Sequence, residues 1–250
     1  MDFRLTAVNK ISDTWASRLR LLGFSLFPGR CLVCGNHSGR RADLCPGCES
    51  DLPLNSNACR RCALPLRETV PAIAICGTCL ADPPPHQSCI APLRYQSPVN
   101  CLLNAFKHRG KFSAGAALAE MMLQQLHDHR ELPEWLVPVP LHWRRQWLRG
   151  FNQATWLAHY LGRRLAIPVA TSLLRRTRHT APQQGQDRRH RLANLKRAFA
   201  LHGPVPPAHI ALVDDVVTTG STARTLAGLL IHGGATRVDV WCLARTPLEK

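Results

Sequence analysis

The segment V-D-D-V-V-T-T-G-S-T, residues 213–222, gathers two carboxylates and four hydroxyls around one glycine. An apolar run, H-I-A-L-V, precedes it, and a helical pattern follows from about Ser221. In an open α/β fold, a turn between a strand and a helix leaves backbone amides free to bind an anion. We therefore predict a phosphate site built from the amides and hydroxyls of Thr218, Thr219, Gly220, Ser221 and Thr222.

Asp214 and Asp215 need a different partner, because carboxylates repel phosphate. Carboxylates suit sugar hydroxyls, or a Mg²⁺ ion that they share with a phosphate. A site with a phosphate at one end and a diol at the other describes a ribose 5-phosphate. The chain has no G-x-x-x-x-G-K-[ST] nucleotide-binding loop, since Gly110-Lys111 is followed by Phe112.

Eight of the 11 cysteines form four Cys-x-x-Cys pairs, a spacing typical of metal ligands. Two such turns complete a tetrahedron around Zn²⁺, so we expect one or two structural zinc ions. The turns could combine consecutively or in a cross-braced order at each zinc, and the sequence leaves both schemes open. The alternative to metal binding is that the cysteines are redox pairs or free thiols. We expect the three other cysteines to be buried apolar residues. The four pairs are Cys31/Cys34, Cys45/Cys48, Cys59/Cys62 and Cys76/Cys79, and the other three are Cys89, Cys101 and Cys242.

The formal net charge is +16, and the excess is concentrated between residues 141 and 200, where thirteen Lys and Arg accompany a single acid, Asp187. Such a stretch indicates contact with a polyanion or a pyrophosphate, whereas a solvated basic surface is the plainer alternative. Trp143 and Trp147 stand beside three arginines and could stack on the bases of single-stranded DNA. Phe151 and Trp156 fit the core of a helix better.

The pattern of strand, loop, helix and strand over residues 209–244 is a βαβ unit, which predicts an α/β fold with a parallel sheet. We expect a helical leader at 1–28, a cysteine-rich domain at 29–82, a Pro-rich linker at 83–88 and the α/β domain at 89–250. No apolar run is long enough for a transmembrane segment, and we expect a cytoplasmic protein.

The segment I-A-L-V-D-D-V-V-T-T-G-S-T-A resembles the 5-phosphoribosyl-1-pyrophosphate (PRPP) signature of type I phosphoribosyltransferases. Together with residues 137–154, N-L-K-R-A-F and the cysteine pairs, it resembles the ComF family of competence and DNA-utilisation proteins. This resemblance covers nearly all of the chain after residue 28. It implies a double zinc ribbon, a type I phosphoribosyltransferase-like domain, and a role in natural transformation or in the use of external DNA.

The resemblance also implies roles for single residues. Asp214 and Asp215 would meet the ribose hydroxyls of Mg-PRPP, and residues 218–222 its 5-phosphate. Arg144 and Arg149, the two arginines of the family's R-x-x-x-x-R-G-F-N-Q motif, would face the pyrophosphate. The rest of the motif is Gly150, Phe151, Asn152 and Gln153, while Gln183, Arg191 and Asn194 match a catalytic flexible loop in which Gln186 replaces the family's usual leucine.

Two functions follow as hypotheses. The first is a protein that binds PRPP or a related phosphoribosyl ligand and single-stranded DNA. The second is an active phosphoribosyltransferase with an unknown acceptor. The sequence shows no domain that would recognise a nucleobase, unless the zinc ribbons do so. The ribbons could equally dock on DNA-uptake machinery at the inner membrane.

Overall fold

The computed structural model describes residues 29–39, 43–66, 74–127, 129, 131–141, 147, 149–177 and 198–248. The predicted leader, 1–28, lies outside them. The chain divides into two compact units, 1–51 and 52–250, and each is described by itself. Within the described ranges, no helix is both long and apolar enough to cross a membrane.

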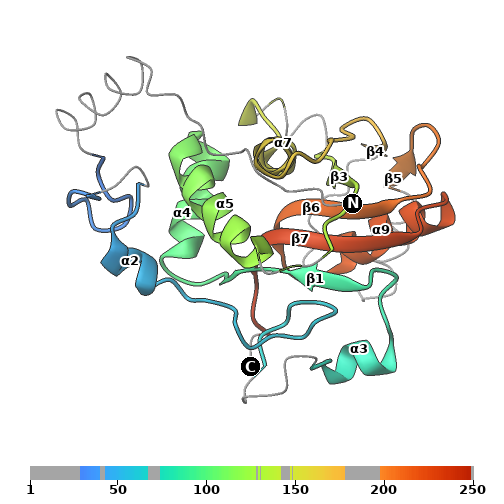
Figure 1. Cartoon of the computed structure of the whole chain (residues 1–250), viewed down its shortest axis with the longest axis horizontal. Helices are drawn as coiled ribbons and strands as arrows, with labels where there is room; N and C mark the ends of the chain where they lie inside the picture. Colours follow the sequence, from blue (N-terminus) through green and yellow to red (C-terminus); the bar gives the residue numbers. More distant parts are fainter. Residues whose placement is uncertain are drawn as a thin grey trace, which may run out of the picture. The chain divides into compact units, whose positions relative to one another are not determined.

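A five-stranded sheet forms the centre of the second unit (Figure 1). Its strand order is β1-β7-β6-β3, and β2 pairs with the far end of β7. Every neighbouring pair is parallel, which confirms the prediction of a parallel α/β sheet. The strands are β1 (Ser88–Ile90), β2 (Leu93–Arg94), β3 (Trp135–Pro138), β6 (His209–Val217) and β7 (Arg237–Arg245).

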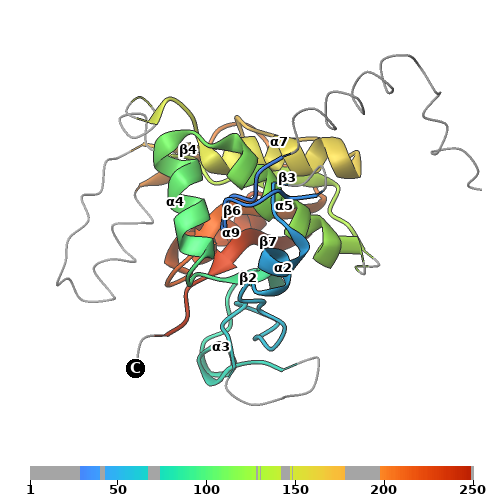
Figure 2. The same ribbon diagram turned by 90° about the vertical axis from the view of Figure 1, so that its left-hand side faces the viewer.

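Within the described residues, four helices pack around the sheet. Helices α5 and α7 run together on the upper side of the sheet in Figure 2. Helix α9 joins β6 to β7, and its Leu226 and Leu230 share one buried cluster with Ile210, Leu212 and Val240 of the strands. The helices are α4 (Val99–Arg109), α5 (Phe112–His127), α7 (Gln153–Leu165) and α9 (Ser221–His232).

A short antiparallel pair, β4 (Leu174–Arg176) and β5 (Phe199–Leu201), stands apart from the main sheet. The strongly basic segment 178–197 connects these two strands and lies outside the described residues. The loop predicted there, with Gln183, Gln186, Arg191 and Asn194, therefore stays a prediction.

Strand β6 is longer than its apolar run suggests. The run H-I-A-L-V predicts a strand that ends at Val213, but the pairing with β7 continues from Asp214↔Cys242 to Val217↔Arg245. The β-branched pair Val216-Val217 suits this extension. The two aspartates consequently lie on the strand itself, and the turn into α9 is reduced to residues 218–220.

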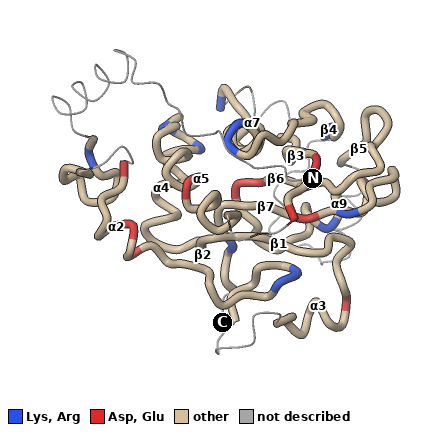
Figure 3. The backbone as a smooth tube through the Cα atoms, in the orientation of Figure 1, with Lys and Arg blue, Asp and Glu red and all other residues tan. Residues whose placement is uncertain are grey.

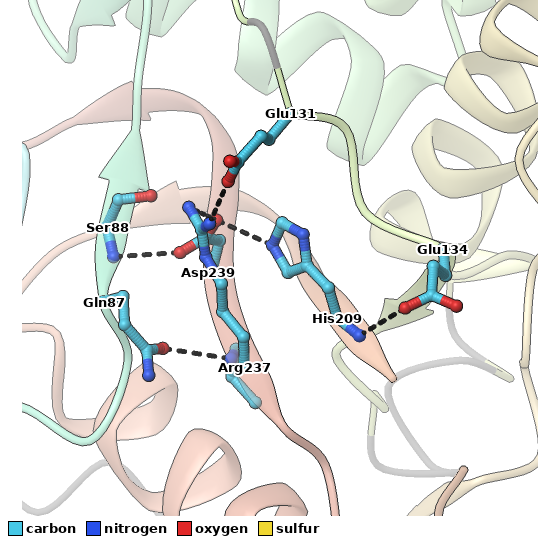
Figure 4. Close-up of polar contacts among 8 residues, drawn as sticks. Gln87, Ser88, Glu131, Glu134, His209, Arg237 and Asp239 are labelled. Atoms are coloured by element: carbon cyan, nitrogen blue, oxygen red, sulfur yellow. Dashed lines mark hydrogen bonds and ion pairs between the residues drawn. The ribbon is translucent and has the colours of Figure 1, made fainter. Parts of the chain in front are cut away.

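A buried polar cluster holds the starts of β1, β6 and β7 together (Figure 4). Asp239, which is 4% exposed, accepts hydrogen bonds from His209 Nε2 at 2.8 Å and from the backbone N–H of Ser88 at 3.0 Å. It also pairs with Arg237 at 2.9 Å, and Arg237 reaches Glu131 at 2.7 Å. This cluster lies at the amino ends of the strands, whereas the predicted phosphate turn lies at their carboxyl ends.

Candidate functional site

The turn between β6 and α9 has the donors that a phosphate needs. Gly220 precedes the helix with φ of 77°, a left-handed conformation that glycine adopts without strain. Thr219 Oγ1 lies 2.9 Å from Ser221 Oγ and 3.4 Å from Ser221 N. The second distance is long, so the backbone N–H of Ser221 donates only a weak hydrogen bond to Thr219. The first amides of a helix have no partner within the helix, so those of Ser221 and Thr222 suit a bound anion.

The acidic pair is anchored by a lysine that the sequence did not point to. Lys107 Nζ, in the last turn of α4, lies 3.0 Å from Asp215 Oδ2, and these two side chains are 16% and 14% exposed. Asp214 Oδ1 accepts a hydrogen bond from Asp215 N at 2.8 Å. Burial, together with the charge of Asp215, raises the pKa of Asp214 to about 8. The red segment of β6 in Figure 3 marks this acidic pair, in the carboxyl half of the strand.

The R-G-F-N-Q motif sets the beginning of α7. Asn152 caps the helix, because its Oδ1 accepts from Ala154 N at 3.0 Å, and its Nδ2 donates to Val139 O at 3.0 Å. Gln153 is 2% exposed and contacts both Arg149 and the carbonyl of Lys107, each at 3.4 Å. The amide side chains of the motif therefore have structural partners.

The motif lies beside the acidic strand, because β3 neighbours β6 and Val139 N donates to Val213 O at 2.9 Å. Arg149 is thus on the β3 side of the candidate site and Arg245 on the β7 side. Arg144, the other predicted pyrophosphate ligand, lies outside the described residues.

Phe151 and Trp156, which were expected to fit the core, are both half-buried. Phe151 packs 4.9 Å from Phe112 and 5.4 Å from Phe106, measured between ring centroids. Trp156 packs 5.0 Å from Phe106, so both predicted core residues belong to an aromatic cluster. Trp147 is 83% exposed, while Trp143 lies outside the described residues.

The structure places only part of the basic stretch. Of its thirteen cationic residues, the described ranges include Arg149, Arg163, Arg164, Arg175 and Arg176. Arg164 pairs with Glu120, and Arg176 lies over the ring of Phe199 at 5.3 Å. A continuous DNA-binding groove therefore stays a prediction.

The eight paired cysteines form two separate groups, Cys31/Cys34/Cys45/Cys48 and Cys59/Cys62/Cys76/Cys79. Within each group the sulfurs lie within 4.8 Å of one another, which establishes the consecutive pairing. Cys34 Sγ lies 3.8 Å from Cys45 Sγ, and Cys62 Sγ lies 3.7 Å from Cys76 Sγ. Zn–S bonds of about 2.3 Å would place the sulfurs of a tetrahedron about 3.8 Å apart, so the residues fit structural zinc.

The two groups repeat one local design. In each, the first pair forms a tight turn, closed by Gly35 N donating to Cys31 O at 2.9 Å and by Ala63 N donating to Cys59 O at 2.7 Å. The third cysteine of each group then caps a five-residue helix, α2 (Pro46–Ser50) or α3 (Gly77–Ala81). A hydrogen bond from Cys62, aided by backbone amides and opposed by burial, lowers the pKa of Cys59 to about 4, whereas the same hydrogen bond and burial raise the pKa of Cys62.

The three unpaired cysteines differ from one another. Cys89 and Cys242 are buried in the sheet, as predicted. Cys101 is exposed on the surface of α4, so the expectation that it is buried was wrong. Helical periodicity places it one residue outside the apolar stripe that contains Leu102 and Leu103.

The parallel sheet, the acidic pair at the carboxyl end of its central strand and the hydroxyl-rich turn define a phosphoribosyltransferase-like α/β protein. Residues 24–80 match the family model of the double zinc ribbon domain. The DNA utilization protein YhgH of Escherichia coli K12 is 38% identical over 230 residues, which are 88% of this chain and 98% of that protein. Competence protein F of Haemophilus influenzae is 35% identical over 230 residues, 88% of this chain and 99% of that protein. The chain belongs to this ComF family of competence and DNA-utilisation proteins.

More distant similarities are weaker. Competence protein ComFC of Streptococcus pneumoniae is 28% identical over 151 residues, covering 60% of this chain and 65% of that protein. Among solved structures, a purine phosphoribosyltransferase from Pyrococcus horikoshii is 13% identical, with a TM-score of 0.34 over 54% of this chain and 88% of that one. The glutamine PRPP amidotransferase of Bacillus subtilis is 17% identical, with a TM-score of 0.38 over 52% and 26%.

Proposed function

We propose that the chain binds a phosphoribosyl ligand, PRPP or a relative of it, together with Mg²⁺ at the end of β6. The 5-phosphate would lie on residues 218–222, and Asp214 and Asp215 would meet the ribose diol or the metal. Arg149, with Arg144, would face the pyrophosphate. The observation that carries this proposal is the direct succession of acidic pair, short turn and open helix start.

Ser221→Asp is the sharpest test of the phosphate site. A carboxylate there would use the amides itself and favour the helix start, so the fold should tolerate it. It would repel a ligand phosphate, and like charges in such proximity cost several kcal/mol. We expect affinity for Mg-PRPP, measured by calorimetry, to fall about 100-fold or more.

Ser172→Asp is the matched control, because Ser172 is exposed in a turn between α7 and β4 and the charge change is the same. Its affinity should equal that of the parent. Unchanged binding by Ser221→Asp would contradict the proposed phosphate site.

We further propose that the protein acts on external DNA and binds single strands through the basic stretch 141–200. Membership of a family named for DNA utilisation and competence supports the role, and the charge of this stretch supports the mode of binding. The two thiolate-rich groups suit a reducing compartment, which favours the cytoplasm. Partners in DNA uptake at the inner membrane fit this role.

An active phosphoribosyltransferase is the second candidate, and one observation favours it. A cavity of about 590 Å³ adjoins the phosphate turn and could admit an acceptor. Release of pyrophosphate from PRPP in the presence of an acceptor, abolished by Asp215→Asn, would support this activity. Tight PRPP binding with no turnover for any base tested would favour the binding function.

A further inference from the structure

Arg245, the last residue of β7, is a buried cation whose partners are backbone carbonyls. It is 5% exposed, and its Nε donates to Cys62 O at 2.9 Å. Its Nη1 donates to Val217 O at 3.1 Å, to Thr246 O at 2.7 Å and to the carbonyl of Thr218. A buried arginine usually pairs with a carboxylate, but Arg245 has none within the described ranges. Its contacts instead connect a cysteine turn to the end of β6 and the phosphate turn.

The contacts with Val217 and Thr218 fix the direction of the amide groups in the turn. A trans peptide unit is planar, so the C=O of one residue and the N–H of the next point in opposite directions. Because Arg245 holds these two carbonyls, the N–H groups of Thr218 and Thr219 point away from it. Neither of these N–H groups, nor that of Gly220, donates a hydrogen bond to any described residue. Arg245 thus keeps free donors of the turn in the orientation that a bound phosphate would need.

The other end of this connection depends on the four-cysteine group of the same compact unit. We call it the second cysteine group, Cys59/Cys62/Cys76/Cys79. Four residues are buried in its small core within the described ranges, and three are its own cysteines while the fourth is Leu64. So few apolar contacts do not hold a tight turn and a five-residue helix together, so the folding energy has to come from metal binding. The position of Cys62 O, and with it that of Arg245, therefore depends on zinc.

A second arginine attaches the other side of the turn to the same group. Arg224, in the first turn of α9, donates to Asp82 O at 2.6 Å and to Asp82 Oδ1 at 3.0 Å. Asp82 directly follows α3, the short helix of the second cysteine group. Its side chain is 64% exposed, so this ion pair contributes less than the buried contacts of Arg245. The phosphate turn is thus connected to the second cysteine group on both sides.

We infer that Arg245 is a positioning residue for the phosphate turn, and that through it ligand binding depends on metal in the second cysteine group. With the group loaded, Cys62 O holds the guanidinium, and the guanidinium holds the carbonyls of Val217 and Thr218. Without metal this support is lost, and the amides of the turn no longer have a fixed direction. This inference rests on the proposed phosphate site.

Thermodynamic linkage makes such a dependence mutual. If zinc in the second cysteine group raises the affinity of the turn for a phosphate, a phosphate at the turn raises the affinity of that group for zinc by the same factor. The zinc affinity therefore reports on the turn without any measurement of activity.

The test measures zinc affinity on the full-length chain by equilibrium competition with a chelating dye, with and without saturating ribose 5-phosphate. Calorimetry establishes ribose 5-phosphate binding separately. One of the two zinc ions of the parent should be bound about tenfold more tightly in the presence of ribose 5-phosphate, and the other should not change. In Cys34→Ser the remaining ion belongs to the second cysteine group, and it should show the tenfold gain.

Arg245→Gln should bind ribose 5-phosphate at least about tenfold more weakly and should lose the effect of this ligand on zinc affinity. Arg60→Gln is the matched control, because Arg60 is an exposed arginine of the same cysteine group and the change of charge is the same. It should equal the parent in both measurements. A residue that only stabilised the fold would not change the dependence of zinc affinity on the ligand.

The inference is overturned if ribose 5-phosphate binds the parent and leaves both zinc affinities unchanged, or raises both equally. It is also overturned if Arg245→Gln retains the tenfold gain. Failure of ribose 5-phosphate to bind the zinc-loaded parent would overturn the proposed phosphate site itself, and this inference with it.

Discussion

Lys107 Nζ, at the end of α4, lies 3.0 Å from Asp215 Oδ2 on the central strand. This ion pair joins the helical layer to the predicted ribose site, and it is largely shielded from solvent. Loss of the lysine would leave a carboxylate without its partner next to Asp214, whose own charge is already disfavoured.

Lys107→Gln should therefore lower the free energy of unfolding by about 1–3 kcal/mol, since a mostly buried charged group loses its partner. Urea denaturation of the parent and the variant measures this. Lys111→Gln makes the same chemical change at an exposed site and should cost within about 0.5 kcal/mol. Equal losses in the free energy of unfolding would show that the Lys107–Asp215 ion pair contributes nothing to stability beyond an exposed lysine.

The raised pKa of Asp214 predicts a pH dependence of ligand binding. Burial and the charge of Asp215 raise this pKa to about 8, so Asp214 is protonated at pH 7 in the free protein. A diol or a Mg²⁺ ion binds the carboxylate, so binding below pH 8 must release a proton. Affinity for Mg-PRPP should rise up to about tenfold per pH unit between pH 6 and 8 and then level off.

Calorimetry at pH 7 in buffers of different ionisation enthalpy would detect the released proton directly. Asp214→Asn should show neither the release nor the rise with pH. A flat affinity between pH 6 and 8 in the parent would contradict a direct role for Asp214.

The two four-cysteine groups should differ in their effect on the ligand site. Cys34→Ser and Cys79→Ser should each reduce the zinc content from two ions per chain to one, because each group has four ligands. Cys79→Ser should also weaken ribose 5-phosphate binding at least about tenfold, because Cys62 O would no longer hold Arg245 beneath the turn.

Cys34 belongs to the other compact unit, so its variant should bind ribose 5-phosphate within about twofold of the parent. Zinc content is measured with a chelating dye and binding by calorimetry. Equal loss of binding in both variants would argue against a specific link between the group Cys59/Cys62/Cys76/Cys79 and the turn.

The polar cluster around Asp239 should dominate the stability of the strand starts. Burial alone would raise the pKa of Asp239. Hydrogen bonds from His209 and Ser88, together with the charge of Arg237, outweigh this effect and lower the pKa of Asp239 below its ordinary value. A carboxyl with a lowered folded pKa stabilises the fold above its unfolded pKa of about 3.9, and this stability is lost as pH falls below that value.

Asp239→Asn should lower the free energy of unfolding at pH 7 by about 3–5 kcal/mol, because it leaves Arg237 without its buried partner. The side chain of Glu131 is 75% exposed, so Glu131→Gln should cost no more than about 1 kcal/mol. Urea denaturation at pH 7 and pH 3 would reveal both effects. A destabilisation by Asp239→Asn that is as large at pH 3 as at pH 7 would contradict an electrostatic origin.

Single-stranded DNA binding should depend on salt through the basic stretch. Removing one phosphate contact reduces the slope of log affinity against log salt by about 0.7, and we expect this change for Arg149→Gln and for Arg144→Gln. Asp214→Asn should leave the slope unchanged. Binding by the arginine variants with the parent's affinity and slope would exclude this stretch as the DNA groove.

Stacking by Trp147 is a separate expectation, since this ring is 83% exposed. Trp147→Ala should weaken binding of a single strand by about tenfold, whereas Trp147→Phe should retain most of it. Fluorescence anisotropy with a labelled oligonucleotide measures both. Equal binding by the alanine variant would leave Trp147 without a role.

Much of the α/β fold could be predicted because its signals are local. The β6–α9–β7 unit shows strand and helix periodicity within 40 residues, and the helix start at Ser221 follows from the glycine before it. The length of β6 could not be predicted, because its last four residues are set by pairing with β7. The cysteine spacing predicted metal sites but left the pairing open, since either scheme completes a tetrahedron.

The partners of the site residues could not be predicted, because they come from distant segments. Lys107 reaches Asp215 from α4, and Arg245 of β7 donates to the carbonyl of Cys62. His86 lies in a Pro-rich stretch that looked like a linker, yet it is buried against Arg61. Such contacts depend on how the elements pack, which sequence periodicity does not encode.

A crystal structure of the zinc-loaded protein soaked with ribose 5-phosphate and Mg²⁺ would test the central claim most directly. We predict phosphate density within hydrogen-bond distance of the amides of Ser221 and Thr222, with the ribose diol toward Asp214 and Asp215. An empty turn at saturating ligand, or a phosphate bound only elsewhere on the chain, would contradict it.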